Sequence, residues 1–175
     1  RAEKALQRSE SRLRQIIDLV PHMIFAKDEE GRFLLANRTV AKYYGTTVDV
    51  LLGHGRQDSQ DTTGHSKSLH PDDREVFEHG NEKITPEEKF IDADGNVRIL
   101  QATRIPLLAY GRDRPAVLGV AVDITELKRA EEALRESEEK YRNLVERAND
   151  GICILQDALV KYGNGQIAQM SGYPI

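Results

Sequence analysis

The sequence has one cysteine, Cys153, among its 175 residues, so neither an intrachain disulfide nor a thiolate metal cluster can form. Basic residues are not in excess either, because 25 lysines and arginines stand against 29 aspartates and glutamates. A phosphate-binding face needs concentrated basic side chains. The one basic cluster, Lys128-Arg129, has acidic neighbours. We therefore expect no nucleic-acid partner.

The sequence also lacks an apolar run long enough to cross a bilayer, and it has neither an initiating methionine nor a signal peptide. It begins at Arg1 within a helical pattern and ends at Tyr173-Pro174-Ile175. Together with the scarcity of cysteine, these features indicate a cytoplasmic piece of a longer protein. The missing parts of that protein could include a membrane anchor.

What the sequence does contain is an internal repeat with a period of about 128 residues, which is the size of a domain. The matching segments are Ala2–Glu10 with Ala130–Glu138, Leu13–Ile17 with Tyr141–Val145, and, after a one-residue deletion, Ala36–Ala41 with Gly163–Ala168. The repeat predicts a connecting helix, a domain, a second connecting helix and the start of a second copy of the domain.

Both connecting helices carry a heptad pattern. Leu127, Leu134 and Tyr141 follow one another at intervals of seven, and Leu6 and Leu13 do the same in the first helix. Such a seam favours a left-handed coiled coil and predicts a homodimer through these helices. Small and polar residues at the other seam positions weaken the predicted helix pairing. Weak pairing suits a connection between domains that changes its arrangement. The alternative is a single helix lying on its own domain.

Between the connecting helices the pattern indicates strands with short helices among them. Glycine turns after residues 28 and 92 predict two hairpins. The predicted strands cover residues 24–27, 32–35, 88–92, 97–108 and 116–124, the short helices cover 37–44, 48–52 and 71–79, and a polar loop covers 53–68.

Several of these segments resemble the PAS domains of bacterial signalling proteins. Asp123–Glu131 is similar to the family's closing motif, and Asp28–Phe33 with Ala36-Asn37 is similar to its opening hairpin and first helix. Asp92–Asn96, continuing through Ile105-Pro106-Leu107, resembles its central hairpin. The resemblance covers residues 13–131 and again 138–175.

The resemblance implies an α+β PAS fold, a five-stranded antiparallel sheet with short helices on one face that encloses a pocket. The expected layout is a connecting helix over residues 1–13, a complete PAS domain over 14–125, a connecting helix over 126–147 and a truncated second PAS domain over 148–175. The short second copy cannot bury a core alone, so we expect loose order there or pairing with another chain's strand edge.

The resemblance also implies a sensory or regulatory module of a signal-transduction protein such as a sensor histidine kinase. Neither a nucleophile elbow nor a phosphate-cradling glycine loop occurs, so we expect this piece to be non-catalytic, although its parent could be a histidine kinase or a diguanylate cyclase. The expected partners are an unknown small molecule and the neighbouring PAS and output domains. The alternative is a ligand-free domain that serves for dimerisation or as a spacer.

Matching the long strand to the family places alternate residues of this strand and the last strand toward the pocket. The predicted ligand-contacting residues are Phe25, Tyr43, Phe77, Leu100, Ala102, Arg104, Gly119 and Ala121. A charge that faces a pocket needs a partner. For Arg104 this partner is either a ligand carboxylate or phosphate, or internally Glu87, Glu88 or Asp92.

The cofactor remains unknown from the sequence. Haem needs an axial histidine, and solvated or capping roles explain each histidine better, with His79 the best of the candidates His22, His54, His65, His70 and His79. Covalent flavin photochemistry is excluded for the first domain, which has no cysteine. Cys153 is expected to be a small buried residue of the second copy.

The last strand leads directly into the second connecting helix. Asp123 and Thr125 stand where a helix cap is needed, and Leu127 and Leu134 follow on the seam. We therefore predict that these four residues relay a small shift of the sheet to the pairing of the helix.

Overall fold

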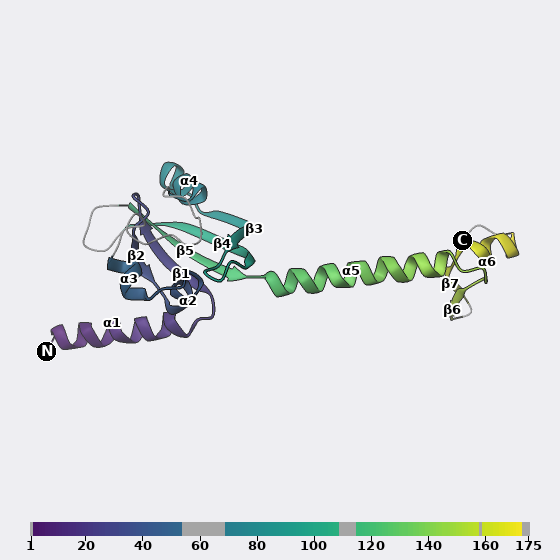
Figure 1. Cartoon of the computed structure of the whole chain (residues 1–175), viewed down its shortest axis with the longest axis horizontal. Coiled ribbons are helices and arrows are strands. Elements are labelled where there is room, and N and C mark those ends of the chain that lie inside the picture. Colours follow the sequence, from purple (N-terminus) through teal and green to yellow (C-terminus); the bar gives the residue numbers. More distant parts are fainter. Residues whose placement is uncertain (1, 54–68, 109–114, 158, 173–175) are drawn as a thin grey trace. The chain divides into compact units, whose positions relative to one another are not determined.

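The computed structural model describes residues 2–53, 69–108, 115–157 and 159–172. The chain divides into two compact units, Arg1–Thr125 and Glu126–Ile175 (Figure 1). The elements of the first unit are α1 (Ala2–Leu19), β1 (Met23–Asp28), β2 (Phe33–Ala36), α2 (Arg38–Tyr43), α3 (Val48–Gly53), α4 (Pro71–His79), β3 (Lys83–Ile91), β4 (Val97–Leu108) and β5 (Pro115–Asp123). The polar loop predicted over residues 53–68 lies almost wholly outside the described residues.

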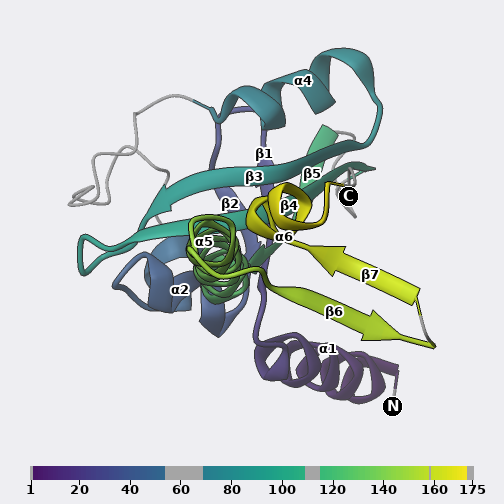
Figure 2. The same ribbon diagram turned by 90° about the vertical axis from the view of Figure 1, so that its right-hand side faces the viewer.

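The strands of the first unit form a five-stranded sheet in the order β2-β1-β5-β4-β3, with every neighbouring pair antiparallel. Helices α2 and α3 pack against β1 and β2, and α4 packs against β3, β4 and β5. Figure 2 shows α4 and α2 lying against different parts of this sheet. The predicted α+β class with a five-stranded antiparallel sheet is confirmed.

Both predicted hairpins form by the same device. Gly31 N–H donates to Asp28 O over 2.9 Å, and Gly95 N–H donates to Asp92 O over the same distance. Each aspartate side chain also accepts the backbone N–H groups two and four residues later. The two glycines have φ of +78° and +82°, a conformation that glycine adopts without steric cost.

Asn37 joins the first helix, the first strand and the second helix. It is fully buried, and its Nδ2 donates to the carbonyl oxygens of Ile17 (2.9 Å) and His22 (2.8 Å). Its Oδ1 accepts from the N–H groups of Ile24 (3.2 Å) and Val40 (3.1 Å), the latter as the N-cap of α2. One side chain therefore fixes where the chain leaves α1, enters β1 and begins α2.

Two elements begin or end away from their predicted limits. The first helix continues past residue 13 to Leu19. Strand β3 begins at Lys83 rather than at Glu88, with a register irregularity between Thr85 and Glu88. Pro86 lies at this irregularity and cannot donate a ladder hydrogen bond, which is why the sequence pattern of a strand is broken there.

The second unit contains most of α5 (Thr125–Glu146), followed by β6 (Cys153–Gln156), β7 (Leu159–Gly163) and α6 (Gly165–Ser171). Strands β6 and β7 pair as an antiparallel hairpin, which Figure 2 shows side by side. Asn164 is fully buried and caps α6. Its Nδ2 donates to the carbonyl oxygens of Val145 (2.8 Å) and Asp150 (3.0 Å), and its Oδ1 accepts from Ile152 N–H (2.9 Å).

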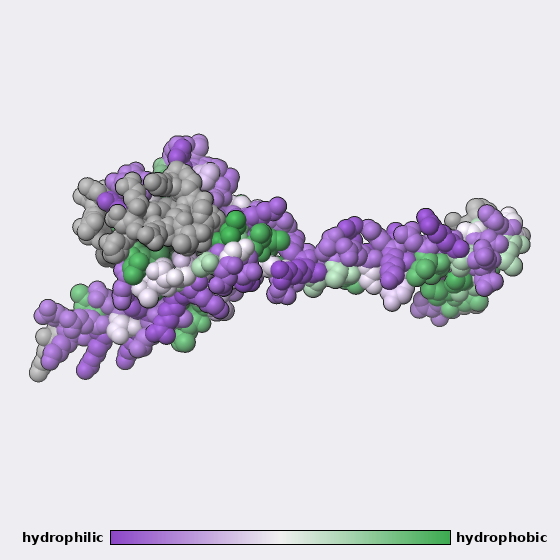
Figure 3. All heavy atoms as spheres, in the orientation of Figure 1, coloured by the Kyte–Doolittle hydropathy of each residue, from purple (hydrophilic) through white to green (hydrophobic). Residues whose placement is uncertain are grey.

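Apolar side chains remain uncovered on the helices and on the second unit. On α5 the seam residues Leu127, Leu134 and Tyr141 are more than half exposed. Apolar surface also lies over the β6–β7 hairpin region (Figure 3), where Leu155 and Leu159 are exposed. None of the helices in the described residues combines the length and the hydropathy needed to cross a membrane.

Candidate functional site

A cavity of about 90 Å³ lies in the first unit between the sheet and the elements that cover it. Its walls are the side chains of Met23, Phe25, Lys27, Phe33, Val40, Tyr44, His70, Glu88, Lys89, Phe90, Leu100, Arg104 and Ala121. Aromatic rings form much of this lining: Phe25 meets Phe33 edge to face at 6.3 Å between ring centroids, and Tyr44 meets Phe90 at 5.5 Å. The site is therefore mostly apolar, with a charged group of residues in one part of its wall.

The space over the middle of the sheet is taken by Phe25. Strand β1 pairs with β5 so that Phe25 lies opposite Gly119. A methyl group added at Gly119 would lie 2.3 Å from the Phe25 ring, so the absence of a side chain at this glycine leaves the space that the ring occupies. The Phe25 ring therefore lies close against Gly119 on the neighbouring strand.

Arg104 is the centre of the charged part of the wall. Its Nε donates to Asp73 Oδ1 over 2.8 Å, and its Nη2 donates to Glu88 Oε2 over 2.7 Å. The remaining nitrogen, Nη1, donates to Asp72 Oδ2 over 3.2 Å. Only 4% of the side chain is exposed. Three carboxylates thus compensate the charge of the buried guanidinium. Burying this charge without partners would carry a large free-energy cost.

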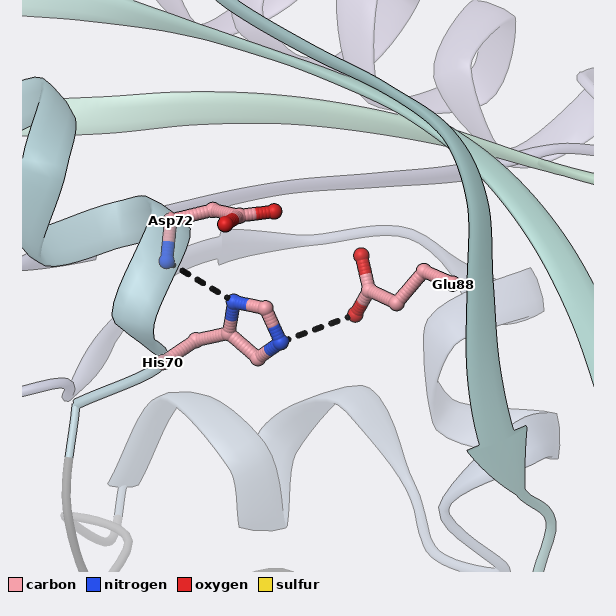
Figure 4. Close-up of side chains that lie close together, drawn as sticks. All are labelled: His70, Asp72 and Glu88. Atoms are coloured by element: carbon pink, nitrogen blue, oxygen red, sulfur yellow. Dashed lines mark hydrogen bonds and ion pairs between the residues drawn. The ribbon is translucent and has the colours of Figure 1, made fainter.

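His70 bridges two of these carboxyl-bearing residues, as Figure 4 shows. Its Nδ1 accepts the N–H of Asp72 over 3.2 Å as the N-cap of α4, and its Nε2 lies 3.1 Å from Glu88 Oε1. Burial acts to raise the pKa of Glu88, but the hydrogen bond from His70 and the charge of Arg104 outweigh it and lower this pKa to about 2. Glu88 is therefore held as a carboxylate.

His70, Asp72 and Glu88 could also supply ligand atoms to a metal ion, since these atoms lie within 4.8 Å of one another. However, Arg104 already donates to both carboxylates. A metal ion would have to share them with a buried positive charge. The arrangement fits an internal ion-pair network better than a metal centre.

Lys27 completes the network from the sheet side. It lies on β1 with 5% of its surface exposed, and its Nζ is 3.4 Å from Asp73 Oδ2. The same ammonium lies 4.8 Å from the ring centroid of Phe25 and 5.0 Å from that of Phe33, within cation–π range. A lysine is thus buried among aromatic rings in the cavity wall.

The predicted ligand-contacting residues fall into three groups. Phe25, Leu100, Arg104 and Ala121 line the cavity. Ala102 and Gly119 are buried in the sheet beside it. Tyr43 and Phe77 are not among the lining residues. The hydroxyl of Tyr43 binds Asp123 at the end of β5, and Phe77 is half-buried on α4. Ligand contact by any of them stays a prediction.

Sequence reasoning missed Lys27 and the two aspartates that pair with Arg104. A signal for Lys27 existed, because Met23, Phe25 and Lys27 share one face of a strand by their alternate spacing. Asp72 and Asp73 lie in the first turn of α4, a position that by itself favours acidic residues, so their sequence context gives no sign of a partner. Glu88, one of the internal partners considered for Arg104, does pair with it.

The junction between β5 and α5 gathers several elements at Asp123. Its Oδ1 accepts both the N–H (2.8 Å) and the hydroxyl of Thr125, and its Oδ2 accepts the hydroxyl of Tyr43 over 2.6 Å. Thr125 Oγ1 in turn accepts Ile99 N–H of β4 over 2.9 Å. Two predicted relay residues, Asp123 and Thr125, therefore link α2, β4 and β5 to the first residue of α5.

The other two predicted relay residues, Leu127 and Leu134, are exposed on α5. Of the histidines, His22 precedes β1 and His79 ends α4, where its side chain is exposed, whereas His54 and His65 lie outside the described residues. Cys153, expected to be buried, is exposed on β6. The expectation was wrong because the described part of this unit has no further strands that cover the hairpin.

Comparison with known proteins places these features in a family. A family model described as PAS fold matches residues 17–129, and one described as PAS domain matches residues 139–175. The two-component sensor PprA of Pseudomonas aeruginosa is 31% identical over 176 residues, which cover 96% of this chain and 18% of that protein. The aerobic respiration control sensor protein ArcB of Escherichia coli is 28% identical over 128 residues, covering 73% of this chain and 16% of that protein.

The chain thus spans less than a fifth of the length of these relatives. Among solved structures, the PAS domain of Bordetella pertussis BvgS superposes with a TM-score of 0.51 at 24% identity, over 77% of this chain and 98% of that one. This likeness supports the fold. With the family model matching 17–129, well over half of the sequence, the chain belongs to the PAS domain family.

Proposed function

We propose that the chain is a sensory and regulatory PAS module of a sensor histidine kinase, which passes a change in the domain through the helix after Asp123-Ile124-Thr125. Two observations support this function: relatives of the chain are named as sensor proteins, and Asp123 and Thr125 join the sheet to the start of α5. The signal is a small molecule in the cavity or a partner on the domain. The predicted boundaries, with the complete domain at residues 14–125, are part of the proposal.

The junction at Asp123 is the observation that carries the proposal. Asp123 and Thr125 together hold the start of α5 by hydrogen bonds to β4 and to α2. A shift of β4 relative to β5, or of Tyr43 on α2, must therefore change either these bonds or the start of α5. Leu127 and Leu134 lie within the next turns of this helix, on the seam expected to pair with a second chain.

A ligand-free dimerising spacer is the second candidate, and the size of the cavity favours it. About 90 Å³ is well below the roughly 300–1,000 Å³ that is usual for small-molecule pockets. Arg104, the strongest ligand-binding group in the wall, is already paired with three carboxylates. In this case the domain transmits a change from a neighbouring domain through the same junction.

The test is a pair of substitutions in the full-length protein, with autophosphorylation as the output. Asp123→Ala and Thr125→Ala remove the bonds between β4, β5 and α5, and we expect each to change the output several-fold. Thr125→Ser keeps the hydroxyl and Asp94→Asn alters an exposed aspartate of a hairpin turn, so both should leave the output unchanged. An unchanged output in Asp123→Ala and Thr125→Ala, with the fold intact by circular dichroism, would refute the relay.

Native mass spectrometry of the purified chain separates the two candidates. A small molecule that the protein retains after purification, or binds when it is added at millimolar concentration, supports the sensor, whereas a dimer that binds none under either condition supports the spacer. Denatured extracts, analysed in parallel, identify any molecule that leaves the protein during desolvation.

A further inference from the structure

Lys27 has more hydrogen-bonding capacity than the described residues use. An ammonium group carries three N–H donors. Within the parts of the chain that the structure describes, the polar partner of Lys27 Nζ is Asp73 Oδ2, at the long distance of 3.4 Å. Its other close neighbours are the faces of the Phe25 and Phe33 rings. At 5% exposure it has little access to bulk water. Two of its donors thus have no polar partner among the described residues and are available to something inside the cavity.

The other buried charged groups of the wall are paired more closely than Lys27, and the remaining lysine of the lining, Lys89, is exposed to water. Three of the five N–H groups of the Arg104 guanidinium donate to carboxylates, one from each nitrogen, so its charge is compensated by three anions at close range. Glu88 is bound on one oxygen by Arg104 and on the other by His70. Lys27, with one ion pair at 3.4 Å, is therefore the buried charged group of the cavity with the weakest pairing among the described residues, and the one best able to bind a guest.

From this we infer that the cavity binds a small neutral molecule with a carbonyl or amide oxygen, which accepts a hydrogen bond from Lys27 Nζ while the apolar remainder packs among Phe25, Phe33 and Phe90. The inference rests on the proposed sensory function and names the chemistry of its ligand. A neutral acceptor satisfies the unused donors and places apolar atoms against aromatic rings.

The charges of the network decide that the guest is neutral. Asp72, Asp73 and Glu88 supply three negative charges, and Lys27 and Arg104 supply two positive ones. A buried anion would add a second uncompensated negative charge, and burying an unpaired charge is costly. A cation would meet the ammonium of Lys27 itself. A neutral dipole with its oxygen toward Lys27 avoids both penalties.

The volume sets the size of the guest. An apolar cavity of about 150 Å³ accommodates benzene, and the cavity here measures about 90 Å³. The ligand is therefore smaller than benzene, with only a few non-hydrogen atoms. A molecule this small binds weakly, with a Kd of about a millimolar.

The test is an NMR titration of the isotopically labelled 175-residue chain with three probes of nearly the same shape. Acetamide is neutral and offers a carbonyl oxygen, acetate is anionic, and acetamidinium is cationic. We expect acetamide to give saturable shifts at Lys27, Phe33 and Phe90, and the two ions to bind at least tenfold more weakly. Acetate binding as tightly as acetamide, or no saturable shift with acetamide, would overturn the inference. The second outcome means that the cavity holds water alone.

Substitution then localises the contact. Lys27→Met keeps the length of the side chain and removes the donors, so acetamide affinity should fall at least tenfold, while Lys89→Met, at an exposed lysine of the same lining, should retain it. Unchanged affinity in Lys27→Met would refute the role of Lys27. If Lys27→Met does not fold, the three-probe comparison on the unaltered chain still decides. If acetamide does not bind but Asp123→Ala changes the output, the ligand chemistry is rejected and the relay stands. If acetamide binds but Asp123→Ala leaves the output unchanged, the relay is rejected and the ligand chemistry stands.

Discussion

The hydroxyl of Tyr43 donates to Asp123 Oδ2 over 2.6 Å and so joins the end of α2 to the residue that accepts the first N–H of α5. Burial and this hydrogen bond raise the pKa of Tyr43 to about 12. Burial acts to raise the pKa of Asp123, but the hydrogen bonds from Thr125 and Tyr43 outweigh it and lower that pKa. The pair is therefore a neutral phenol bound to a carboxylate.

Removing this phenol should weaken the domain. Tyr43→Phe deletes a hydrogen bond to a charged acceptor that is partly shielded from water, and we expect a loss of about 1–2 kcal/mol in the free energy of unfolding. Urea denaturation measures it. Tyr162→Phe deletes an exposed phenol–carboxylate bond in the second unit and should cost less. Equal losses in the two variants would contradict the role given to burial.

The same phenol predicts a loss of stability in alkali. The folded state raises the pKa of Tyr43 from 10 to about 12, so the folded chain binds more protons between these values than the unfolded chain does. The contribution is complete below pH 10 and is lost as the pH rises toward 12. Unfolding free energies measured across pH 9–12 should therefore fall more steeply for the unaltered chain than for Tyr43→Phe.

Glu88 predicts the opposite behaviour in acid. Its pKa is lowered from 4.5 to about 2 in the folded state, so its contribution is complete above pH 4.5 and is lost as the pH falls toward 2. Between pH 5 and pH 2 the unaltered chain should lose about 2 kcal/mol more stability than Glu88→Gln does, allowing for partial screening by solvent. Glu82→Gln, at an exposed glutamate, should follow the unaltered chain. Parallel curves for Glu88→Gln and the unaltered chain would contradict this assignment.

Gly119→Ala should disturb both the sheet and the cavity. The added methyl group would lie 2.3 Å from the ring of Phe25, which must move, and overpacking of this kind costs about 1–3 kcal/mol. The smaller side chain of Phe25→Leu should relieve part of the strain, so the double variant should be more stable than the sum of the single losses predicts. Additive losses would show that the ring and the glycine do not conflict.

Asn37→Asp should be at least as destabilising as Asn37→Ala. The carboxylate keeps the acceptor for Val40 N–H, but it replaces the Nδ2 donor with an oxygen that faces the carbonyls of Ile17 and His22. Burying unsatisfied acceptors together costs about 1–3 kcal/mol per group. Thermal unfolding of both variants decides, and a milder loss in Asn37→Asp would mean that capping α2 is the main task of the residue.

The elements of the domain were predictable where local chemistry determines them. The turns at Gly31 and Gly95, the cap at Asn37 and the proline at the start of α4 are each specified by a few adjacent residues. The start of β3 was not predicted, because Pro86 breaks its pattern and only pairing with β4 extends the strand. Local signals describe elements, whereas pairing depends on distant partners.

The candidate site was predicted less completely for a related reason. The strand positions of Leu100 and Arg104 follow from alternation, so their inward direction could be predicted. The partners of Arg104 on α4 depend on where that helix packs, which no short segment specifies. The packing of Phe25 against Gly119 likewise depends on the register between β1 and β5, which are neighbours in the sheet but lie at opposite ends of the domain's sequence.

The matching bonds of Asn37 and Asn164 bear on the order in which a PAS domain folds. Asn164 makes its bonds in a unit that contains a helix, one hairpin and a short helix, so this arrangement needs nothing from strands such as β3, β4 and β5. Its contacts are close in sequence, whereas β1 meets β5 by pairing Met23 with Ala121. Local contacts form at a lower entropic cost than distant ones. We therefore expect the part of the domain around this asparagine, with its first hairpin and the short helix that follows, to assemble first. Strand β5 then pairs with β1 and completes the sheet.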